Sequence, residues 1–279
     1  MFHDLVILPR SLVAPDLAAM DLMWMFPRDP RFEGLIWDYP SIILGIVLFY
    51  LIMVLKVGPA WMSTREPIPL RTATRAFNLF QVLANIWFSY HVIAITYRNY
   101  YTGLFSFGCN PPSINSTLDN KEDELMLGAV TIFYLWVRIL DLLDTAFFVL
   151  AKKQSHVTFL HVYHHVIVVC TFYVYLRSGW SPSIFYVGII NSLVHVVMYS
   201  YYFLSTFPTL RPYLWWKKYL TALQIVQFCV FIIQIVWNTL FNCGYPITVF
   251  QYNFVQMVIF LGLFTRFYLF NYGKQEKTE

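Results

Sequence analysis

Seven long apolar stretches run through this chain of 279 residues and constrain its fold more than any other feature. Each is close to the roughly 20 residues that an α-helix needs to cross the ~30 Å hydrocarbon core of a bilayer. The stretches are 42–57, 77–97, 125–150, 157–176, 183–204, 219–240 and 248–270. Because 58% of the residues are hydrophobic and only 12% are charged, the hydrophobic residues cannot all be hidden inside a soluble domain. The sequence therefore predicts an all-α integral membrane protein with seven transmembrane helices.

The segments between these stretches are short and contain helix-breaking residues, such as Gly58-Pro59 and Ser181-Pro182. We expect one membrane domain, residues 40–272, between an N-terminal segment, residues 1–39, and a C-terminal tail, residues 273–279. The N-terminal segment carries several aspartates and no uninterrupted apolar run, so we expect no cleavable signal peptide.

The uneven distribution of lysine and arginine over the loops predicts the orientation in the membrane, because short cytosolic loops retain these residues. With an odd number of spans, most of them fall in one set of loops: Lys56, Arg65, Arg71, Arg75, Lys152, Lys153, Arg211, Lys217, Lys218, Lys274 and Lys277. We therefore expect a luminal N-terminus and a cytosolic C-terminus. The net charge of +4 is too small and too dispersed to predict a nucleic acid partner.

Three histidines, His161, His164 and His165, lie within the fourth apolar stretch. In a helix, this spacing places them on one side, where they can act on one ligand. Ionisable side chains at membrane depth are costly, so by default they indicate a functional site. Two other interpretations stay open at this point: structural histidines packed against carbonyl groups, and a metal site, because imidazoles one helical turn apart are frequent metal ligands.

Five motifs follow one another in order along the chain. They span residues 138–145, 152–153, 161–165, 191–202 and 215–227. Their order and spacing resemble those of the very-long-chain fatty acid elongases, the condensing enzymes of the endoplasmic reticulum. The resemblance covers roughly residues 56–272. The chain departs from the family at two positions, with Arg138 where the family usually has Lys and Asp141 where it usually has Glu.

The resemblance implies both a fold and a reaction. Six helices form a barrel around a closed-ended acyl tunnel, and the seventh lies outside it. A long-chain acyl-CoA and malonyl-CoA, the two expected substrates, condense to a 3-oxoacyl-CoA two carbons longer, with release of carbon dioxide and CoA. We expect no metal ion and no cofactor. Further expected partners are membrane lipid, a second copy of the chain in a homodimer and the other enzymes of the elongation cycle, in the endoplasmic reticulum membrane.

The expected catalytic residues are the histidine box, one aspartate and a later histidine. Neutral imidazole is a competent nucleophile towards a thioester, so we expect His164 to form an acyl-imidazole, with His161 and His165 beside it. Asp144 is suited to orient a ring nitrogen and fix its tautomer. His195, on another span, is the expected partner across the site, although on its own it would be interpreted as a packed core histidine.

The expected substrate-binding residues belong to the remaining motifs. They are Lys152, Lys153, Lys217, Lys218, Asn191, Tyr199, Tyr202, Gln224 and Gln227. The lysines are placed to bind CoA phosphates as point charges, unless they serve only to fix the topology. The glutamines are as compatible with hydrogen bonds between helices, and the tyrosines with an interfacial belt.

Two cysteines and one asparagine fall in loops that we assign to the lumen. Cys109 and Cys243 can form a disulfide in that oxidising compartment. Asn115 begins a glycosylation sequon, Asn115-Ser116-Thr117.

Two other classes of protein share features with this chain. A membrane di-iron desaturase or hydroxylase also carries such a histidine box, but it needs roughly eight histidines in repeated boxes, consistent with the nitrogen-rich ligand sets of such metal sites; this chain has seven histidines in total. A non-enzymatic seven-span lipid carrier or receptor agrees with the helix count, but it gives no reason for clustered imidazoles, Asp144 and a basic cytosolic rim to occur together.

Overall fold

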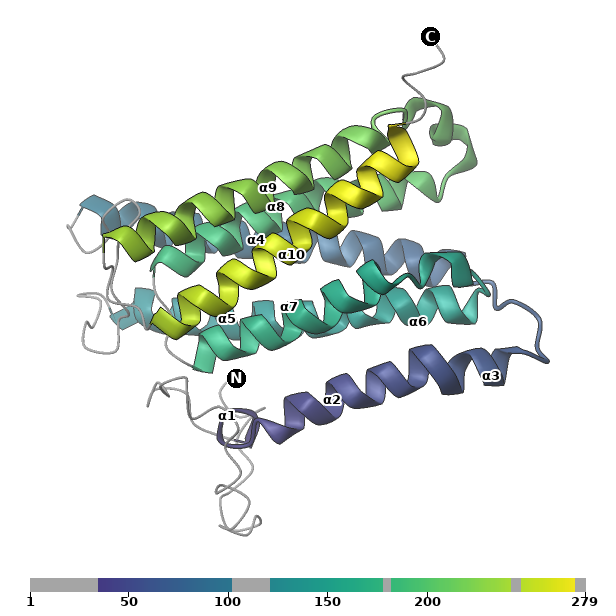
Figure 1. The fold of residues 1–279 in the computed structure, drawn as a ribbon, viewed down its shortest axis with the longest axis horizontal. Helices are drawn as coiled ribbons and strands as arrows, with labels where there is room; N and C mark the ends of the chain where they lie inside the picture. Colours follow the sequence, from purple (N-terminus) through teal and green to yellow (C-terminus); the bar gives the residue numbers. More distant parts are fainter. Residues whose placement is uncertain (1–34, 102–120, 178–181, 242–246, 274–279) are drawn as a thin grey trace. The chain divides into compact units, whose positions relative to one another are not determined.

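The computed structural model describes residues 35–101, 121–177, 182–241 and 247–273, and these segments are helical over nearly their whole length (Figure 1). Within them, seven segments are long and apolar enough to cross a membrane, which confirms the predicted multi-pass all-α protein. The seven are Ser41–Met62, Arg71–Asn99, Leu125–Leu150, Phe159–Arg177, Tyr186–Ser205, Lys217–Leu240 and Ile247–Tyr272.

The chain folds into two compact units, one comprising Met1–Ile68 and Pro112–Trp180 and the other Pro69–Pro111 and Ser181–Glu279. The helices described in the first unit are α1 (Leu35–Asp38), α2 (Ser41–Ile52), η3 (Met53–Val57), α3 (Gly58–Met62), α5 (Lys121–Leu140), α6 (Leu142–Leu150), η5 (Gln154–His156) and α7 (Phe159–Arg177). The expected barrel around a tunnel involves both units and stays a prediction.

The first span does not end at Gly58-Pro59, where the sequence predicted a break. It continues through the π-helical turn η3 into α3, and the backbone N–H of Gly58 donates to the carbonyl oxygen of Met53. Pro59 has no N–H, and its ring would clash with a carbonyl group one α-helical turn earlier. The wider π turn accommodates such a residue inside a helix, so the span extends to Met62.

The luminal end predicted for α7 is packed against the short helix α1. The ring of Tyr173 stacks on Trp37 at 5.6 Å, and its hydroxyl donates to the carbonyl oxygen of Ile36 at 2.8 Å. Arg177 donates to the carbonyl oxygen of Trp37 at 3.2 Å and is buried. These bonds join the start of the described chain to the fourth span.

The helices described in the second unit are α4 (Arg71–Tyr101), α8 (Pro182–Ser205), η6 (Pro208–Tyr213), α9 (Lys217–Leu240) and α10 (Ile247–Tyr272). Helices α4 and α8 pack along each other in antiparallel directions. At one end Arg75 donates to Thr206, just beyond α8, and further along α4 Ser89 bonds to Ser192. Helices α9 and α10 form a second pair, in which Phe228 stacks on Phe260.

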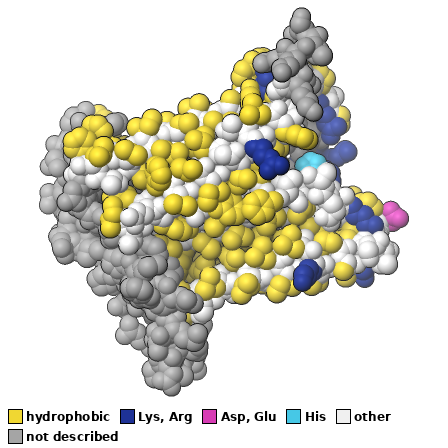
Figure 2. Space-filling view, in the orientation of Figure 1, with side chains coloured by type: hydrophobic (Ala, Val, Ile, Leu, Met, Phe, Trp, Pro, Cys, Tyr) yellow, Lys and Arg dark blue, Asp and Glu magenta, His cyan; other side chains and the backbone are white. Residues whose placement is uncertain are grey.

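Large apolar side chains remain exposed along the spans, and they cover most of the described surface visible in Figure 2. Examples are Phe49 and Ile52 in α2, Ile233 in α9, and Leu269 and Phe270 in α10. In water such a surface would be an extensive aggregation patch, but in a bilayer it faces lipid.

Candidate active site

The three histidines of the box form one cluster in the first two turns of α7. Thr158 caps this helix, because its hydroxyl oxygen accepts the backbone N–H of His161 at 3.2 Å. The ring of His165 lies 4.3 Å from that of His161 and 5.5 Å from that of His164, centroid to centroid. The predicted clustering is therefore confirmed within α7.

An aromatic ring lies between this cluster and the exposed histidine of η5. Phe148 of α6 is 5.5 Å from the ring of His161 and 5.0 Å from that of His156. His156 is exposed, whereas the Nε2 atom of His161 is buried and has no hydrogen-bond partner among the described residues. Because Phe148 has no polar atoms, it separates the imidazoles from the exposed side without competing for their hydrogen bonds.

Asp144 lies in the first turn of α6, next to a residue that is tied to the first span. The hydroxyl groups of Thr145 and Tyr50 are 2.7 Å apart and buried. This bond joins α2 to the turn of α6 that carries Asp144. Whether Asp144 orients a histidine of the box stays a prediction.

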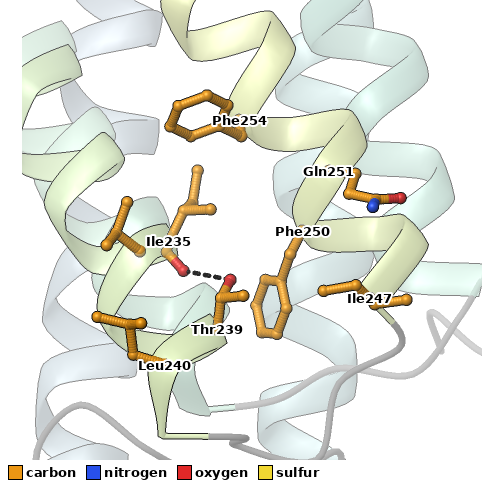
Figure 3. Close-up of a pocket in the computed structure, with 8 residues that line it drawn as sticks. Ile235, Thr239, Leu240, Ile247, Phe250, Gln251 and Phe254 are labelled. Carbon is orange, nitrogen blue, oxygen red and sulfur yellow. Dashed lines mark hydrogen bonds between the residues drawn. The ribbon is translucent and has the colours of Figure 1, made fainter.

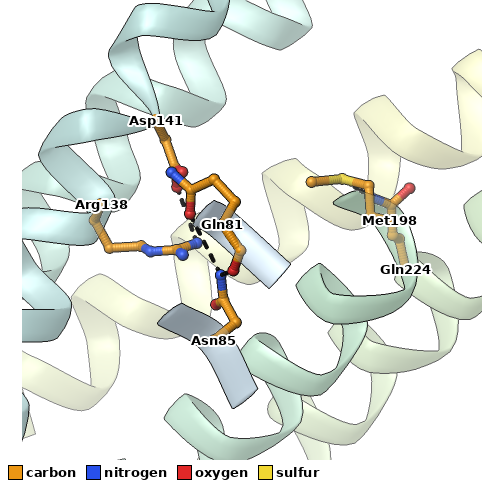
Figure 4. Close-up of polar contacts among 6 residues, drawn as sticks. All are labelled: Gln81, Asn85, Arg138, Asp141, Met198 and Gln224. Carbon is orange, nitrogen blue, oxygen red and sulfur yellow. Dashed lines mark hydrogen bonds and ion pairs between the residues drawn. The ribbon is translucent and has the colours of Figure 1, made fainter. Parts of the chain in front are cut away.

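The two departures from the elongase motif form an ion pair with each other. Arg138 and Asp141 lie 2.9 Å apart, and their side chains are 0% and 4% exposed (Figure 4). The Arg138 guanidinium also lies 4.6 Å from the centre of the Tyr134 ring. The sequence marked both positions, but it did not predict that they pair.

In the second unit, His195 occupies the buried face of α8 and is 5% exposed. Its ring lies 5.7 Å from that of Tyr199, which is fully buried and therefore does not belong to an interfacial belt. Asn191 is half-buried and Tyr202 is exposed. The position of His195 relative to the histidine box stays a prediction, because the two belong to different units.

The two glutamines of α9 differ in their surroundings. The side-chain amide of Gln224 donates to the sulfur of Met198 in α8 at 3.5 Å (Figure 4). Gln227 is buried, and its side-chain oxygen has no hydrogen-bond partner among the described residues. Gln224 therefore makes the interhelical contact, while a role of Gln227 in substrate binding stays a prediction.

The four lysines predicted to bind CoA lie at helix ends. Lys152 and Lys153 are exposed just after α6, and the ammonium group of Lys152 lies 3.5 Å from the carbonyl oxygen of Ser63. Lys217 is exposed at the start of α9, and Lys218 lies over the ring of Tyr219 at 5.3 Å. All four ammonium groups are thus near the ends of spans, as phosphate binding or topology requires.

Three predicted positions, Cys109, Cys243 and Asn115, lie outside the described residues. The disulfide and the glycosylation site stay predictions. Cys170 in α7 and Cys229 in α9 are free thiols.

The structure adds a row of polar residues on α4 that the sequence analysis did not assign. Asn78, Gln81, Asn85 and Ser89 are buried in the second span. Their spacing of three, four and four residues inside an apolar stretch was the signal that sequence reasoning missed.

The described residues form no metal centre, and an apolar pocket that they line is small. Among the described residues, no group of three or more His, Cys, Asp or Glu side chains is arranged to hold a metal ion. An apolar pocket of about 210 Å³ lies between α9 and α10, below the roughly 300–1,000 Å³ of small-molecule sites (Figure 3). Among the described residues that line it, only Thr239 and Gln251 have polar side chains, and the Thr239 hydroxyl already donates to the carbonyl oxygen of Ile235.

Comparison with known proteins identifies similar sequences over most of the chain. The sequence profile of the ELO family, described as the GNS1/SUR4 family, matches residues 35–279. The very long chain fatty acid elongase 5 of Tachysurus fulvidraco is 32% identical over 255 residues, which cover 90% of this chain and 83% of that protein. The proteins of the same name from Bos taurus and Homo sapiens are also 32% identical, over 90% and 89% of this chain and 81% and 80% of theirs.

Proposed function

Because this chain belongs to the GNS1/SUR4 family, we propose that it is an enzyme of very-long-chain fatty acid elongation, namely its condensing enzyme. It joins a long-chain acyl-CoA to malonyl-CoA and forms a 3-oxoacyl-CoA two carbons longer. One observation carries the proposal beyond the names of the relatives. The ring of His165 adjoins those of His161 and His164 inside an apolar helix that is long enough to span a membrane.

In the first half-reaction, a neutral imidazole nitrogen of His164 attacks the thioester carbon of acyl-CoA. The carbon–sulfur bond breaks as the acyl–nitrogen bond forms, and CoA leaves with the proton that the ring loses. The acyl-imidazole is prone to hydrolysis, so it benefits from a dry site. Phe148, between the box and the exposed His156, helps to exclude water on that side.

In the second half-reaction, malonyl-CoA loses its carboxylate as carbon dioxide. The electron pair left on its α-carbon attacks the acyl-imidazole, and the carbon–nitrogen bond breaks. The ring takes up one proton, which restores the enzyme. Overall, acyl-CoA, malonyl-CoA and one proton give 3-oxoacyl-CoA, carbon dioxide and CoA.

The remaining predicted residues have roles in binding and orientation. Asp144 orients a ring nitrogen of the box, and His195 assists the transfer of the acyl group. The four motif lysines bind the anionic head of CoA at the cytosolic side, and the protein resides in the endoplasmic reticulum membrane with its N-terminus in the lumen. The positions of these four lysines at the ends of spans support their assignment to CoA binding.

The test combines product analysis with intact-mass measurement of purified protein. With a panel of acyl-CoAs and labelled malonyl-CoA, we expect 3-oxoacyl-CoA two carbons longer than the substrate. With acyl-CoA alone, we expect an acyl adduct that maps to the box and disappears in His164→Ala, while the control His156→Ala retains it. Absence of product with every chain length contradicts the proposed function. Product that forms without any adduct would mean that the two substrates condense directly, without an acyl-imidazole.

A further inference from the structure

The buried polar row on α4 contains one side chain with unused hydrogen-bonding capacity. Gln81 and Asn85 are both fully buried, with 0% exposure. The Asn85 amide nitrogen donates to the backbone carbonyl oxygen of Gln81 at 2.7 Å and lies 3.4 Å from its side-chain oxygen (Figure 4). The side-chain nitrogen of Gln81, with two N–H donors, has no acceptor among the described residues.

An unsatisfied donor of this kind requires an explanation. Leaving a buried donor without an acceptor costs free energy, and most native structures avoid it. The cost is greater in a membrane span, where water does not compete for the group. A methionine or leucine at position 81 would fill similar space without this cost. The amide is therefore best explained by a ligand that supplies the missing acceptor.

The packing of α4 on α8 places this amide at the level of His195. Ser89 and Ser192 meet with their hydroxyl oxygens 2.5 Å apart, and the ring of Phe77 lies 6.2 Å from that of Tyr199. On α4, the unsatisfied amide lies between these two contact points. On α8, His195 lies between them too. The donor and the histidine therefore share one layer of the second unit.

The chemistry of this layer favours a neutral acceptor. Residues 77–97 of α4 and the whole of α8 contain no Lys, Arg, Asp or Glu. A carboxylate ligand, such as that of malonyl-CoA, would be buried against these two helices without a cation from either of them. A thioester carbonyl oxygen is uncharged in the bound substrate, and it needs a hydrogen-bond donor when it becomes negatively charged.

We propose that the side-chain amide of Gln81 donates a hydrogen bond to the carbonyl oxygen of the acyl thioester during acyl transfer. When a nitrogen nucleophile attacks the thioester carbon, the electron pair of the carbonyl bond moves to this oxygen, and the amide stabilises the resulting oxyanion. The pair returns as the CoA sulfur leaves. Asn85 positions the donor by occupying the Gln81 side-chain oxygen. Gln81 is thus a catalytic residue, an inference that rests on the proposed function.

The test replaces the donor by a side chain of similar length without N–H groups. In full-length purified protein, Gln81→Met is expected to lower kcat by about 100- to 1,000-fold, as for loss of one oxyanion donor. KM for acyl-CoA should stay near the wild-type value, because the bond strengthens only as charge develops. The melting temperature should be unchanged or higher, because the substitution removes an unsatisfied buried donor.

The matched control is Asn253→Leu in α10. Asn253 is another buried amide of the same unit, but its nitrogen donates to the carbonyl oxygen of Val249 at 2.7 Å. Its replacement is expected to affect the melting temperature and to leave kcat per folded molecule unchanged. A Gln81→Met variant with wild-type kcat overturns the inference, as does a loss of kcat that parallels a loss of melting temperature.

A second variant, Gln81→Leu, covers the case in which Gln81→Met does not fold. If neither folds while Asn253→Leu does, Gln81 has a structural role and the inference is wrong. The proposed function is judged separately, on the wild-type protein. A wild type that forms no 3-oxoacyl-CoA contradicts the proposed function, whereas an active wild type with fully active Gln81 variants contradicts only the role of Gln81.

Discussion

The backbone N–H of Lys153 donates to the carbonyl oxygen of Phe148 at 2.8 Å and closes the C-terminal end of α6. A second bond runs from the N–H of Lys152 to the carbonyl oxygen of Val149 at 3.0 Å. Together they form a Schellman motif, which requires a left-handed residue, usually glycine, just past the helix. Here that residue is Lys152, with φ at 55°.

A protein with lysine at this left-handed position is less stable than one with glycine. We therefore expect the ammonium group of Lys152 to be needed for binding acyl-CoA. Lys152→Gly should raise the stability by about 1 kcal/mol, because glycine adopts the left-handed conformation without strain. The same change should raise KM for acyl-CoA, more at low salt than at high salt. Thermal unfolding and initial rates in one detergent measure both effects.

The control Lys152→Ala removes the ammonium group and keeps the strained backbone. It should raise KM as much as the glycine variant does, without the gain in melting temperature. If KM stays at the wild-type value in both variants, Lys152 does not bind CoA, and its contribution is limited to topology.

The second prediction concerns the close approach of α3 to α6. A Cβ atom at Gly58 would lie 2.6 Å from the carbonyl oxygen of Met53 and 2.8 Å from a methyl carbon of Val149. The first contact is with backbone, which cannot rotate away. Gly58→Ala should therefore destabilise the protein by about 1–3 kcal/mol, as overpacking does.

Gly45 provides the matched control in the same span, because a Cβ atom there meets nothing within 4 Å. Gly45→Ala should raise the melting temperature slightly, since alanine is the better helix former. Equal effects of the two substitutions would show that the close approach at Gly58 is not rigid.

The third prediction concerns the bond that joins the first span to the turn carrying Asp144. Tyr50→Phe and Thr145→Val each remove one hydroxyl group of a buried pair that lies 2.7 Å apart. A double-mutant cycle should give a coupling energy of about 1 kcal/mol in thermal or denaturant unfolding. A lower kcat in both single variants would support a positioning role for this bond. Additive stability effects would mean that the two hydroxyl groups are not coupled.

The sequence predicted the helical elements well because membrane spans depend on length and apolarity alone. It was wrong at Gly58-Pro59, where a π turn accommodates the proline and lets the first span continue. This result depends on the backbone of Met53 and on packing against Val149, neither of which a breaker rule considers.

The candidate site was predicted in part. The spacing of His161, His164 and His165 was sufficient to predict one cluster, because helical periodicity determines it. The sequence could not show that Arg138 pairs with Asp141, or that the backbone of Lys152 is left-handed, because both depend on local geometry.

The polar row on α4 was visible in the sequence as polar residues at helical spacing. Its significance depends on which atoms remain without partners, and only a structure with side chains can supply that information. The donor on Gln81 is the clearest example.

The last prediction concerns the ion pair of Arg138 and Asp141, whose side chains are 0% and 4% exposed at a separation of 2.9 Å. Asp141→Asn removes the negative partner of a buried guanidinium and should destabilise the protein by about 3–5 kcal/mol. The elongases usually have Lys and Glu at these positions, so the double variant Arg138→Lys with Asp141→Glu should fold and condense substrate. Arg138→Lys alone and Asp141→Glu alone each mismatch the lengths of the two side chains. Thermal unfolding should show both single variants to be less stable than the double variant. Single variants as stable as the double variant would show that the two positions vary independently, and that the pair seen here does not determine the geometry of this turn.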